Sequence, residues 1–353
     1  MPESTTKIQQ LEQRLGANWQ HLTAARDLAI VKRAELRMAL ARFDSEDTSI
    51  VVSGSLARGE FTEGSDIDWT LLIDGFVDHR HFDVTREIRP IVEKLSAKPP
   101  GPEGTFSAMV FGHDLVHQIG GEDDTNSNTT RRVLLLLESC TIGRQDAHQR
   151  VVRNVLNRYL LEDRGFWSGS RYRVPRFLQN DLARYWRTMA VDFAFKLRAR
   201  SGSGWAIRNM KLRMSRKLIY VSGLLACFRC HLDHMAKDWD VIATDRDRQL
   251  KVVEYFEEVF QETPLEIIAG VLLRFELDDA ARNILGSYNE FLGILADDGQ
   301  RQCLEALAED AAETNEVYRR ARQLSHQFRD GLLTLFFHEA SGMNDLTKNY
   351  GVF

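Results

Sequence analysis

The first third of the chain alternates between helix-like and strand-like patterns of hydrophobic residues. Residues 5–41 carry apolar side chains at helical spacing and contain few Pro or Gly residues, which predicts helix. Residues 49–55 form an apolar run of β type that ends in Gly-Ser, and residues 66–74 alternate apolar and polar positions, which predicts two strands. Residues 79–95 have a helical pattern again, and the Pro-rich segment 98–102 ends it.

The rest of the chain is mostly helical in pattern. A further strand is expected within residues 109–119, followed by a polar loop at 120–130 and an apolar run at 133–137. Helical spacing then dominates to about residue 337, whereas the last residues lose it. We therefore predict an α+β fold, in which a small mixed β-sheet domain is joined to a large helical domain. The expected parts are N-terminal helices at 1–45, the sheet domain at 46–145, the helical domain at 146–340 and a mobile C-terminal tail at 341–353.

The composition is typical of a globular protein from a reducing compartment. Of the 353 residues, 43% are hydrophobic and 27% are charged, and the most apolar runs are far too short to span a bilayer. The first residues lack the basic-then-apolar pattern of a secretory signal, so we expect a cytoplasmic protein. Cys227, Cys230 and His231 have the spacing of a haem-attachment or zinc motif, but two small side chains on a helix are the simpler interpretation.

The net charge of −5 hides a strongly basic band. Residues 171–217 contain ten Arg and three Lys against two Asp, which gives +11 and leaves −16 for the rest of the chain. Such a band indicates a surface for phosphates or nucleic acid, and the alternative is a set of solvated helix faces.

The segment Gly-Ser-Leu-Ala-Arg-Gly-Glu-Phe-Thr-Glu-Gly-Ser-Asp-Ile-Asp, residues 54–68, carries the candidate chemistry. Gly54 lets the backbone approach a phosphate closely, and the Ser55 hydroxyl and nearby amides can hold phosphate oxygens. Arg58 and Ser65, from the same segment, are further candidate contacts to the nucleotide.

Asp66 and Asp68 are the candidate metal ligands. They lie two positions apart in a predicted strand, so both carboxylates point to one face. Neighbouring carboxylates repel each other unless a divalent cation neutralises them, and Mg²⁺ or Mn²⁺ suits such oxygen ligands. Two bound ions would activate an attacking hydroxyl and stabilise a leaving pyrophosphate. A surface hairpin with incidental acids is the alternative interpretation.

This signature resembles that of the DNA-polymerase-β-type nucleotidyltransferases. Segments 137–143, 165–167 and 205–209 also look like those that follow the catalytic strands in bacterial PII uridylyltransferases. The resemblance covers roughly residues 49–225 and is most specific at the first motif. It implies a polymerase-β-like fold and transfer of a nucleoside monophosphate from a nucleoside triphosphate to an acceptor hydroxyl. The chain lacks the phosphohydrolase and regulatory domains of the uridylyltransferases, so their nitrogen-sensing substrate is not implied.

The superfamily pattern also calls for a third carboxylate on a later strand. Glu138, at the end of the apolar run 133–137, holds the matching place and is the first candidate for a third catalytic and metal-binding acid. Asp124 in the preceding loop is the second candidate, and Asp114 is the third. If that apolar run is helical, the case for Glu138 weakens, and the alternative interpretation is a plain buried or capping acid.

The basic helices offer further phosphate contacts. On a helix, Arg208, Lys211 and Ser215 fall on one face, and we expect Lys211 and Arg208 to contact the nucleotide.

The tail contains a candidate acceptor, Tyr350. A tyrosine near the end of a mobile tail could enter the active site. The arrangement looks like the nucleotidyltransferase of the Hailong anti-phage defence systems, which starts a DNA strand on its own tyrosine. That resemblance implies dATP as substrate, a single-stranded oligodeoxyadenylate product and a membrane-channel partner that the product restrains. A homo-oligomer, in which the tail reaches a neighbouring subunit, is compatible with this scheme.

Two other functions remain open. The enzyme could place a single nucleotide on a protein or small molecule, as the uridylyltransferases do. An inactive sheet that only binds nucleotide or RNA is the third reading, and the intact Gly54-Ser55 and Asp66-x-Asp68 pairs argue against it.

Overall fold

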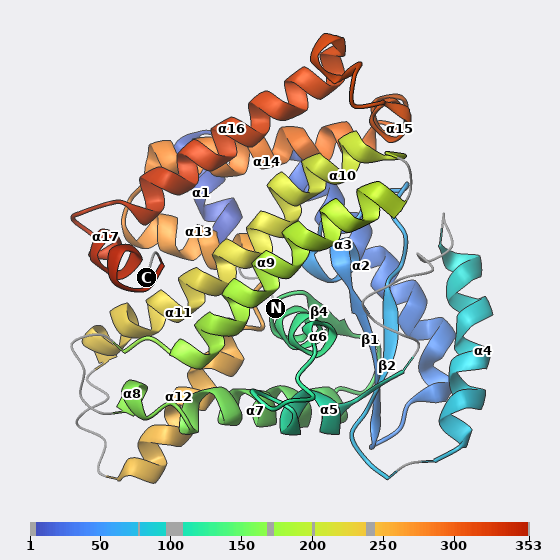
Figure 1. Cartoon of the computed structure of the whole chain (residues 1–353), viewed down its shortest axis with the longest axis vertical. Helices are drawn as coiled ribbons and strands as arrows, with labels where there is room; N and C mark the ends of the chain where they lie inside the picture. Colours follow the sequence, from blue (N-terminus) through green and yellow to red (C-terminus); the bar gives the residue numbers. More distant parts are fainter. Residues whose placement is uncertain are drawn as a thin grey trace.

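A four-stranded mixed sheet lies on one side of a mostly helical molecule (Figure 1). The computed structural model describes residues 5–76, 78–96, 109–167, 173–199, 202–237 and 244–351. The strands are β1 (Thr48–Ser53), β2 (Trp69–Ile73), β3 (Met109–Phe111) and β4 (Ser139–Thr141), in the order β3-β2-β1-β4. β1 pairs antiparallel with β2 and β4, and β2 pairs parallel with β3. The predicted α+β fold with a small mixed sheet is confirmed.

Helices cover both faces of this sheet. α2 (Gln20–Leu40) and α4 (Arg80–Leu95) pack on the face that carries Ile50, Val52 and Leu71. α5 (Gly112–His117), α6 (Asn126–Leu137) and α7 (Asp146–Leu161) lie on the side of Val51 and Leu72, where the sheet joins the core of the helical region. Both faces of β1 and β2 are therefore buried, so their positions are fixed from two sides.

The N-terminal segment forms two helices that are separated by a turn. α1 (Lys7–Leu15) ends where Gly16 adopts a left-handed conformation, with φ of 58°, and donates its N–H to Glu12. Glycine adopts this conformation without strain, so the chain turns here before α2 begins.

The apolar run 133–137, which the sequence pattern left open between strand and helix, is the last part of helix α6. All five residues, from Val133 to Leu137, are at most 3% exposed, because α6 lies between the sheet and the helical region. A helix buried on every side has no polar face, and a short apolar run then cannot be told from a buried strand. The strand expected nearby is β4, which begins two residues later.

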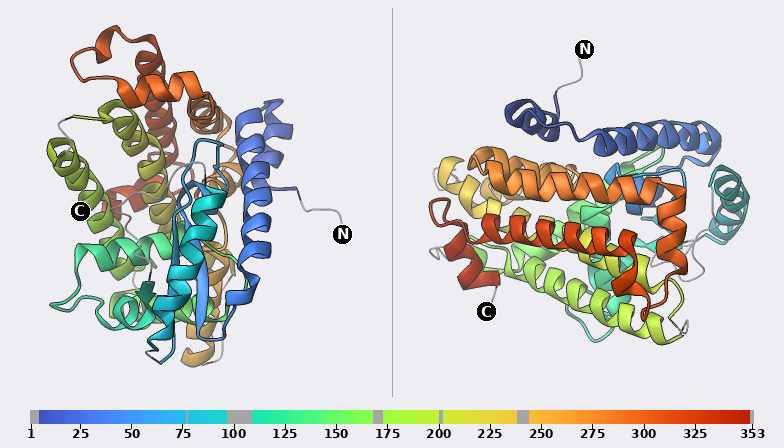
Figure 2. Two further views of the ribbon diagram at one scale, coloured as in Figure 1. Left: turned by 90° about the vertical axis from the view of Figure 1, so that its right-hand side faces the viewer. Right: turned by 90° about the horizontal axis from the view of Figure 1, so that it is seen from above.

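The helical region is built in layers. Seen from above, α14 (Asp278–Ala296), α16 (Glu316–Phe336) and α9 (Arg176–Ala199) follow one another outward from α2 (Figure 2). The remaining elements are η1 (Ala41–Phe43), α3 (Gly54–Arg58), α8 (Arg164–Trp167), α10 (Trp205–Lys211), η2 (Leu212–Arg216), α11 (Lys217–Lys237), α12 (Asp245–Val259), α13 (Pro264–Arg274), α15 (Asp298–Ala306), η4 (Ala312–Thr314), α17 (Met343–Leu346) and η5 (Thr347–Gly351).

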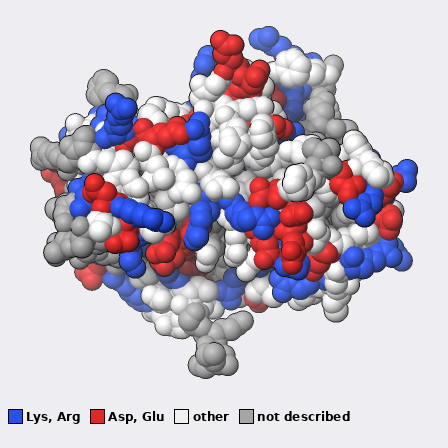
Figure 3. Space-filling model, turned by 90° about the horizontal axis from the view of Figure 1, so that it is seen from below, with Lys and Arg blue, Asp and Glu red and all other residues white. Residues whose placement is uncertain are grey.

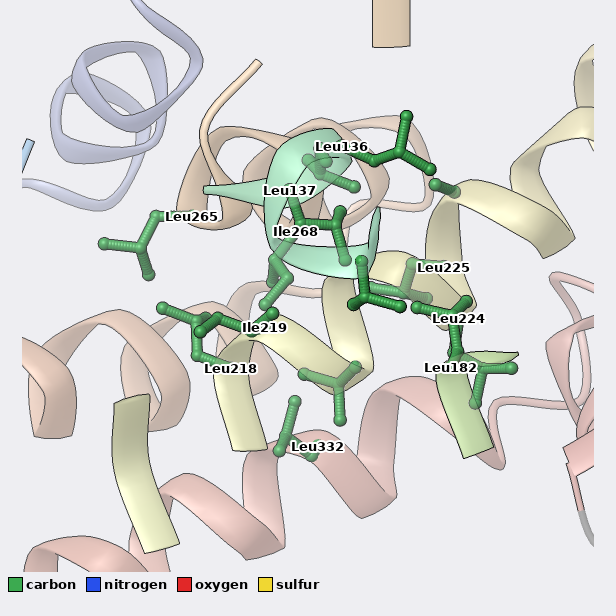
Figure 4. Packing of buried hydrophobic residues seen from close by; sticks show 14 of the residues in the cluster. Leu136, Leu137, Leu182, Leu218, Ile219, Leu224, Leu225, Leu265, Ile268 and Leu332 are labelled. Carbon is green, nitrogen blue, oxygen red and sulfur yellow. The ribbon is translucent and has the colours of Figure 1, made fainter. Parts of the chain in front are cut away.

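One continuous core joins the helical region to the sheet. Leu137 of α6 packs among Leu182, Leu225 and Ile268, which come from α9, α11 and α13 (Figure 4). In the part of the chain that is described, no helix is long and apolar enough to cross a membrane.

The tail forms helical turns, contrary to the expectation that it is aperiodic. Met343 and Leu346 are at most 1% exposed, and the Thr347 hydroxyl donates to the Phe336 carbonyl over 2.8 Å. The short α17 and η5 escaped detection because four- and five-residue elements show too little of a helical period.

Candidate active site

The motif 54–68 leads from β1 through the short helix α3 and a loop back into β2. Gly54 begins α3 with φ of 69°, a left-handed conformation that favours glycine. A β-carbon built on Gly54 would lie 3.0 Å from Oδ2 of Asp68, so the absence of a side chain also makes room for that carboxylate.

Asp66 and Asp68 lie just before β2, not within it as predicted. The Ser53 amide donates to the Asp68 carbonyl over 3.0 Å, which continues the pairing of β1 with β2 by one step. Both carboxylates line a cavity of about 80 Å³ between the motif and the helical region. A larger cavity of about 720 Å³, bounded by β4, α7 and α12, contains neither of them.

Three parts of the chain line the small cavity. The motif contributes Gly54, Ser55, Arg58, Glu60, Thr62, Ser65, Asp66 and Asp68; α10 and η2 contribute Lys211, Ser215 and Arg216; α14 and α15 contribute Leu292, Leu295 and Arg301. Carboxylates from the sheet domain therefore share one cavity with cations from the helical region. The structure brings together all the predicted nucleotide contacts of the motif and Lys211.

The charges at the carboxylate side are crowded. Burial, followed by the negative charges of Asp66 and Glu138, raises the pKa of Asp68 to about 6, while Arg216 and Lys211 act in the opposite direction. A divalent cation would relieve this repulsion, so the donor set fits a metal ion. Asp66 and Asp68 are the residues that could hold it.

A third metal-binding side chain is not in place. Within the described residues, no three His, Cys, Asp or Glu side chains converge as they would around a metal. Glu138 is 3% exposed and caps α6 directly before β4, with its carboxylate accepting hydrogen bonds from Arg58 and Arg216.

Comparison with models of protein families matches residues 33–101 to the nucleotidyltransferase domain. The match includes the whole motif from Gly54 to Asp68. Residues 33–101 are thus similar to a nucleotidyltransferase domain. The match supports the polymerase-β-like superfamily and a nucleotidyltransferase activity in general, with a nucleoside triphosphate as substrate. Neither the curated proteins nor the solved structures gave a match to the chain.

Of the three candidates for a third acid, Glu138 alone contacts the motif, through Arg58, although it does not line the cavity itself. Asp124 is buried in ion pairs with Arg132 at 2.8 Å and Arg184 at 3.2 Å. Asp114 is on α5, and neither aspartate lines the cavity. Glu138 arrives beside the motif although its run is helical, because Ser139 pairs with Ser53.

Two predicted phosphate contacts differ from expectation. Arg58 lines the cavity, but its guanidinium lies between two carboxylates, bonded to Glu60 at 2.8 Å and to Glu138. Arg208 does not line the cavity, and its guanidinium donates to the Ser203 carbonyl at 2.9 Å. Helical spacing does place both residues in α10, but the side chain of Arg208 turns back to Ser203, ahead of the helix, and does not reach the cavity.

Lys211 is the predicted cation that faces the carboxylates. Burial lowers the pKa of its ammonium group, with Arg301 and Arg216 acting in the same direction and Asp66 opposing them. Three cations that line one cavity, Lys211, Arg216 and Arg301, indicate a site for an anion such as a triphosphate.

The basic band does not form a uniform surface. Arg184 and Arg216 are partly exposed and pair with the buried Asp124 and Glu138, and Lys196 pairs with Asp192 at 2.8 Å on the surface of α9. On the face seen from below, Lys and Arg are intermixed with Asp and Glu (Figure 3).

Several site residues gave no signal in the sequence. Arg301 is 7% exposed and reaches the motif from α15, where a β-carbon on Gly64 would lie only 2.6 Å from its Nη1 atom. Tyr288 of α14 donates from its hydroxyl to Glu60 at 2.8 Å. These contacts join residues more than 200 positions apart, so no local pattern encodes them.

Tyr350 lies away from the site. Its carbonyl accepts a hydrogen bond from Gln179 of α9, and the next residue, Gly351, lies against Phe228 of α11. Phe228 is twelve residues along the helical axis from Arg216, which corresponds to about 18 Å at the rise of an α-helix. The structure therefore does not bring this tyrosine together with Asp66 and Asp68.

Proposed function

We propose that the protein transfers a nucleoside monophosphate from a nucleoside triphosphate to an acceptor hydroxyl, with two divalent ions, Mg²⁺ or Mn²⁺, at Asp66 and Asp68. One observation carries the proposal: two crowded carboxylates from the motif and three cations from the helical region line the same cavity. The matched nucleotidyltransferase domain supports this assignment.

Different residues contact the two ends of the triphosphate. Asp66 and Asp68 hold the ions near the α-phosphate, and Lys211, Arg216 and Arg301 bind the β- and γ-phosphates. Gly54 and Ser55 at the start of α3 let the backbone approach the phosphates closely. The bond from the acceptor oxygen to the α-phosphorus forms, the bond to the bridging oxygen breaks, and pyrophosphate leaves. When bound, the ions activate the attacking oxygen and stabilise the leaving group.

Glu138 is the proposed third acid of this site. It is buried beside Asp68 and close enough to raise the pKa of that carboxyl. It needs only to turn from Arg58 and Arg216 toward the ions.

For the acceptor we propose Tyr350 and, for the nucleotide, dATP, as the resemblance to the Hailong enzymes implies. The product would be a single-stranded oligodeoxyadenylate that acts on a membrane-channel partner in anti-phage defence. The docked tail places a condition on this scheme, because Tyr350 must leave α9 and α11 before it reaches a catalytic centre. The same observation favours a second candidate, transfer of a single nucleotide to an external hydroxyl.

Incubation of the purified protein with each labelled ribonucleoside and deoxyribonucleoside triphosphate and Mg²⁺ tests the proposal. We expect incorporation from dATP, as a ladder of products attached to the protein. One discrete addition to another molecule would support the second candidate. No incorporation by the wild-type protein, or normal incorporation by a folded Asp68→Asn variant, would contradict the assigned site.

A further inference from the structure

Arg58 lies between two buried carboxylates at the edge of the active site. Its Nε atom donates to Oε2 of Glu60 over 2.9 Å, its Nη2 lies 2.8 Å from the same oxygen, and its Nη1 donates to Oε2 of Glu138. All three side chains are at most 6% exposed. Burial of an arginine is unfavourable unless its charge is paired, so Arg58 depends on these two carboxylates.

Glu60 is held from the other side by the helical region. The Tyr288 hydroxyl donates to Oε2 of Glu60 over 2.8 Å and lies 3.2 Å from the Ser215 hydroxyl. Oε2 of Glu60 therefore accepts hydrogen bonds from both Arg58 and Tyr288. Oε1 of Glu60 is buried and has no hydrogen-bond partner in the structure. A buried carboxylate oxygen without a donor is costly, which indicates that it is used in another state of the site.

The two carboxylates on Arg58 differ in what else they can bind. Glu138 lies beside Asp68 and can turn toward a cation there, whereas Glu60 is fixed by Tyr288. If Glu138 turns away, Arg58 keeps its Nε and Nη2 contacts with Glu60, and the unused Oε1 of Glu60 can take over one of them. Arg58 and Glu60 then remain a neutral pair, and Arg216, which also loses Glu138, has a half-exposed side chain that solvent can reach.

We propose that Glu60 is a positioning residue, which keeps Arg58 paired so that Glu138 can exchange Arg58 for the divalent cations at Asp66 and Asp68. This rests on the proposed function, because it assumes a metal site at those aspartates. Without Glu60, Arg58 would have Glu138 as its nearest carboxylate and would compete with the metal for it.

The test is Mn²⁺ binding to the nucleotide-free protein, measured by calorimetry, in Glu60→Gln and in the matched control Glu63→Gln. Glu63 is an exposed residue of the same loop. We expect Glu60→Gln to bind Mn²⁺ about tenfold more weakly, the size of effect seen when a residue that supports a metal ligand is lost. Glu63→Gln should bind as the wild type does.

A second substitution separates positioning from a merely structural role. Replacing Arg58 by Met in the Glu60→Gln background removes the competitor for Glu138, so Mn²⁺ affinity should recover toward the wild-type value. Tyr288→Phe, which keeps the ring and loses one hydrogen bond to Glu60, should weaken binding in the same direction and serves if Glu60→Gln does not fold.

Three outcomes would overturn the inference. Equal Mn²⁺ affinity in the Glu60→Gln and Glu63→Gln variants shows that Glu60 has no part in metal binding. Failure of Arg58→Met to restore affinity shows that competition for Glu138 is not the cause. Absence of Mn²⁺ binding in the wild type would instead remove the metal site itself, and the proposed function with it.

Discussion

At the scale of single residues, the site is organised around Asp68. Its carboxylate lies beside Gly54, which has room for it because it lacks a side chain, and the charges of Asp66 and Glu138 act on it directly. In the absence of a cation this arrangement destabilises the ionised form of Asp68, which is why its pKa is raised to about 6. A site that is unfavourable when empty gains more from binding a cation.

The raised pKa predicts a pH-dependent effect of Asp68→Asn on stability. The folded-state pKa of about 6 lies above the usual value of 3.8, so the ionised carboxylate reduces stability progressively as pH rises from about 4 through 6. An Asn at this position cannot ionise, so this loss of stability does not occur. In the presence of a chelator we expect Asp68→Asn to raise the Tm at pH 7.5 and to change it little at pH 4, while abolishing nucleotide transfer at both. An equal Tm difference at the two pH values would contradict the assigned environment.

Glu138 and Asp124 should respond in opposite ways to loss of charge. Glu138→Gln is expected to lower the rate of transfer by orders of magnitude, because it removes a proposed metal ligand. Asp124→Asn should leave the rate per folded molecule almost unchanged but lower stability by about 3 kcal/mol, because it breaks a buried ion pair with Arg132. Thermal unfolding and initial-rate measurements on both variants check this, and the reverse ranking would move the third ligand to Asp124.

At the scale of elements, α10, η2 and α11 follow one another without a break, and η2 is a single turn of π-helix. It lies where Lys211, Ser215 and Arg216 face the cavity, a common position for such a turn in functional sites.

Lys211 and Arg208 form a matched pair on this helix. Lys211→Ala should weaken binding of a nucleoside triphosphate about tenfold or more, since it removes a charged contact to phosphate. Arg208→Ala removes the same charge from a position outside the cavity and should change the affinity less than twofold. Isothermal titration with a non-hydrolysable triphosphate at two salt concentrations measures both. Equal losses would mean that general charge, and not the cavity, attracts the ligand.

The sequence was sufficient for elements whose pattern is local. β1, the motif and β2 follow from an apolar run, a Gly-Ser pair and an alternating run, and Lys211 follows from its place in a basic helix. The end of α6 could not be assigned, because a helix buried on all sides looks like a buried strand over five residues. Arg301 and Tyr288 could not be predicted, because their contacts with the motif depend on how α14 and α15 pack on the sheet domain.

At the scale of the whole molecule, the helical region has two roles at positions twelve residues apart. Arg216, in η2 just before α11, lines the cavity that holds Asp66 and Asp68, and Phe228, in the middle of α11, lies against the tail. The docked tail buries Met343 and Leu346, and exposing two such side chains costs about 3–6 kcal/mol. Under the self-priming proposal, release of the tail therefore limits how often Tyr350 can react.

This leads to a prediction about the tail that a single substitution tests. If α17 and η5 unwind, the nine residues from Gly342 to Tyr350 can extend by up to roughly 31 Å, more than the distance of about 18 Å along α11. We therefore expect Tyr350 to react in the catalytic centre of its own chain, with a rate that does not depend on protein concentration. Leu346→Ala should speed attachment of nucleotide to the protein by roughly tenfold or more, because it weakens docking of the tail by at least about 2 kcal/mol. Tyr350→Phe should abolish attachment.

Intact-mass analysis after incubation with dATP and Mg²⁺, followed by peptide mapping, gives both rates and the modified residue. Mixing Asp68→Asn protein with Tyr350→Phe protein supplies the control, since label on the Asp68→Asn chain would reveal reaction between copies. Undiminished attachment in Tyr350→Phe would exclude self-priming and leave the nucleotidyltransferase with an external acceptor.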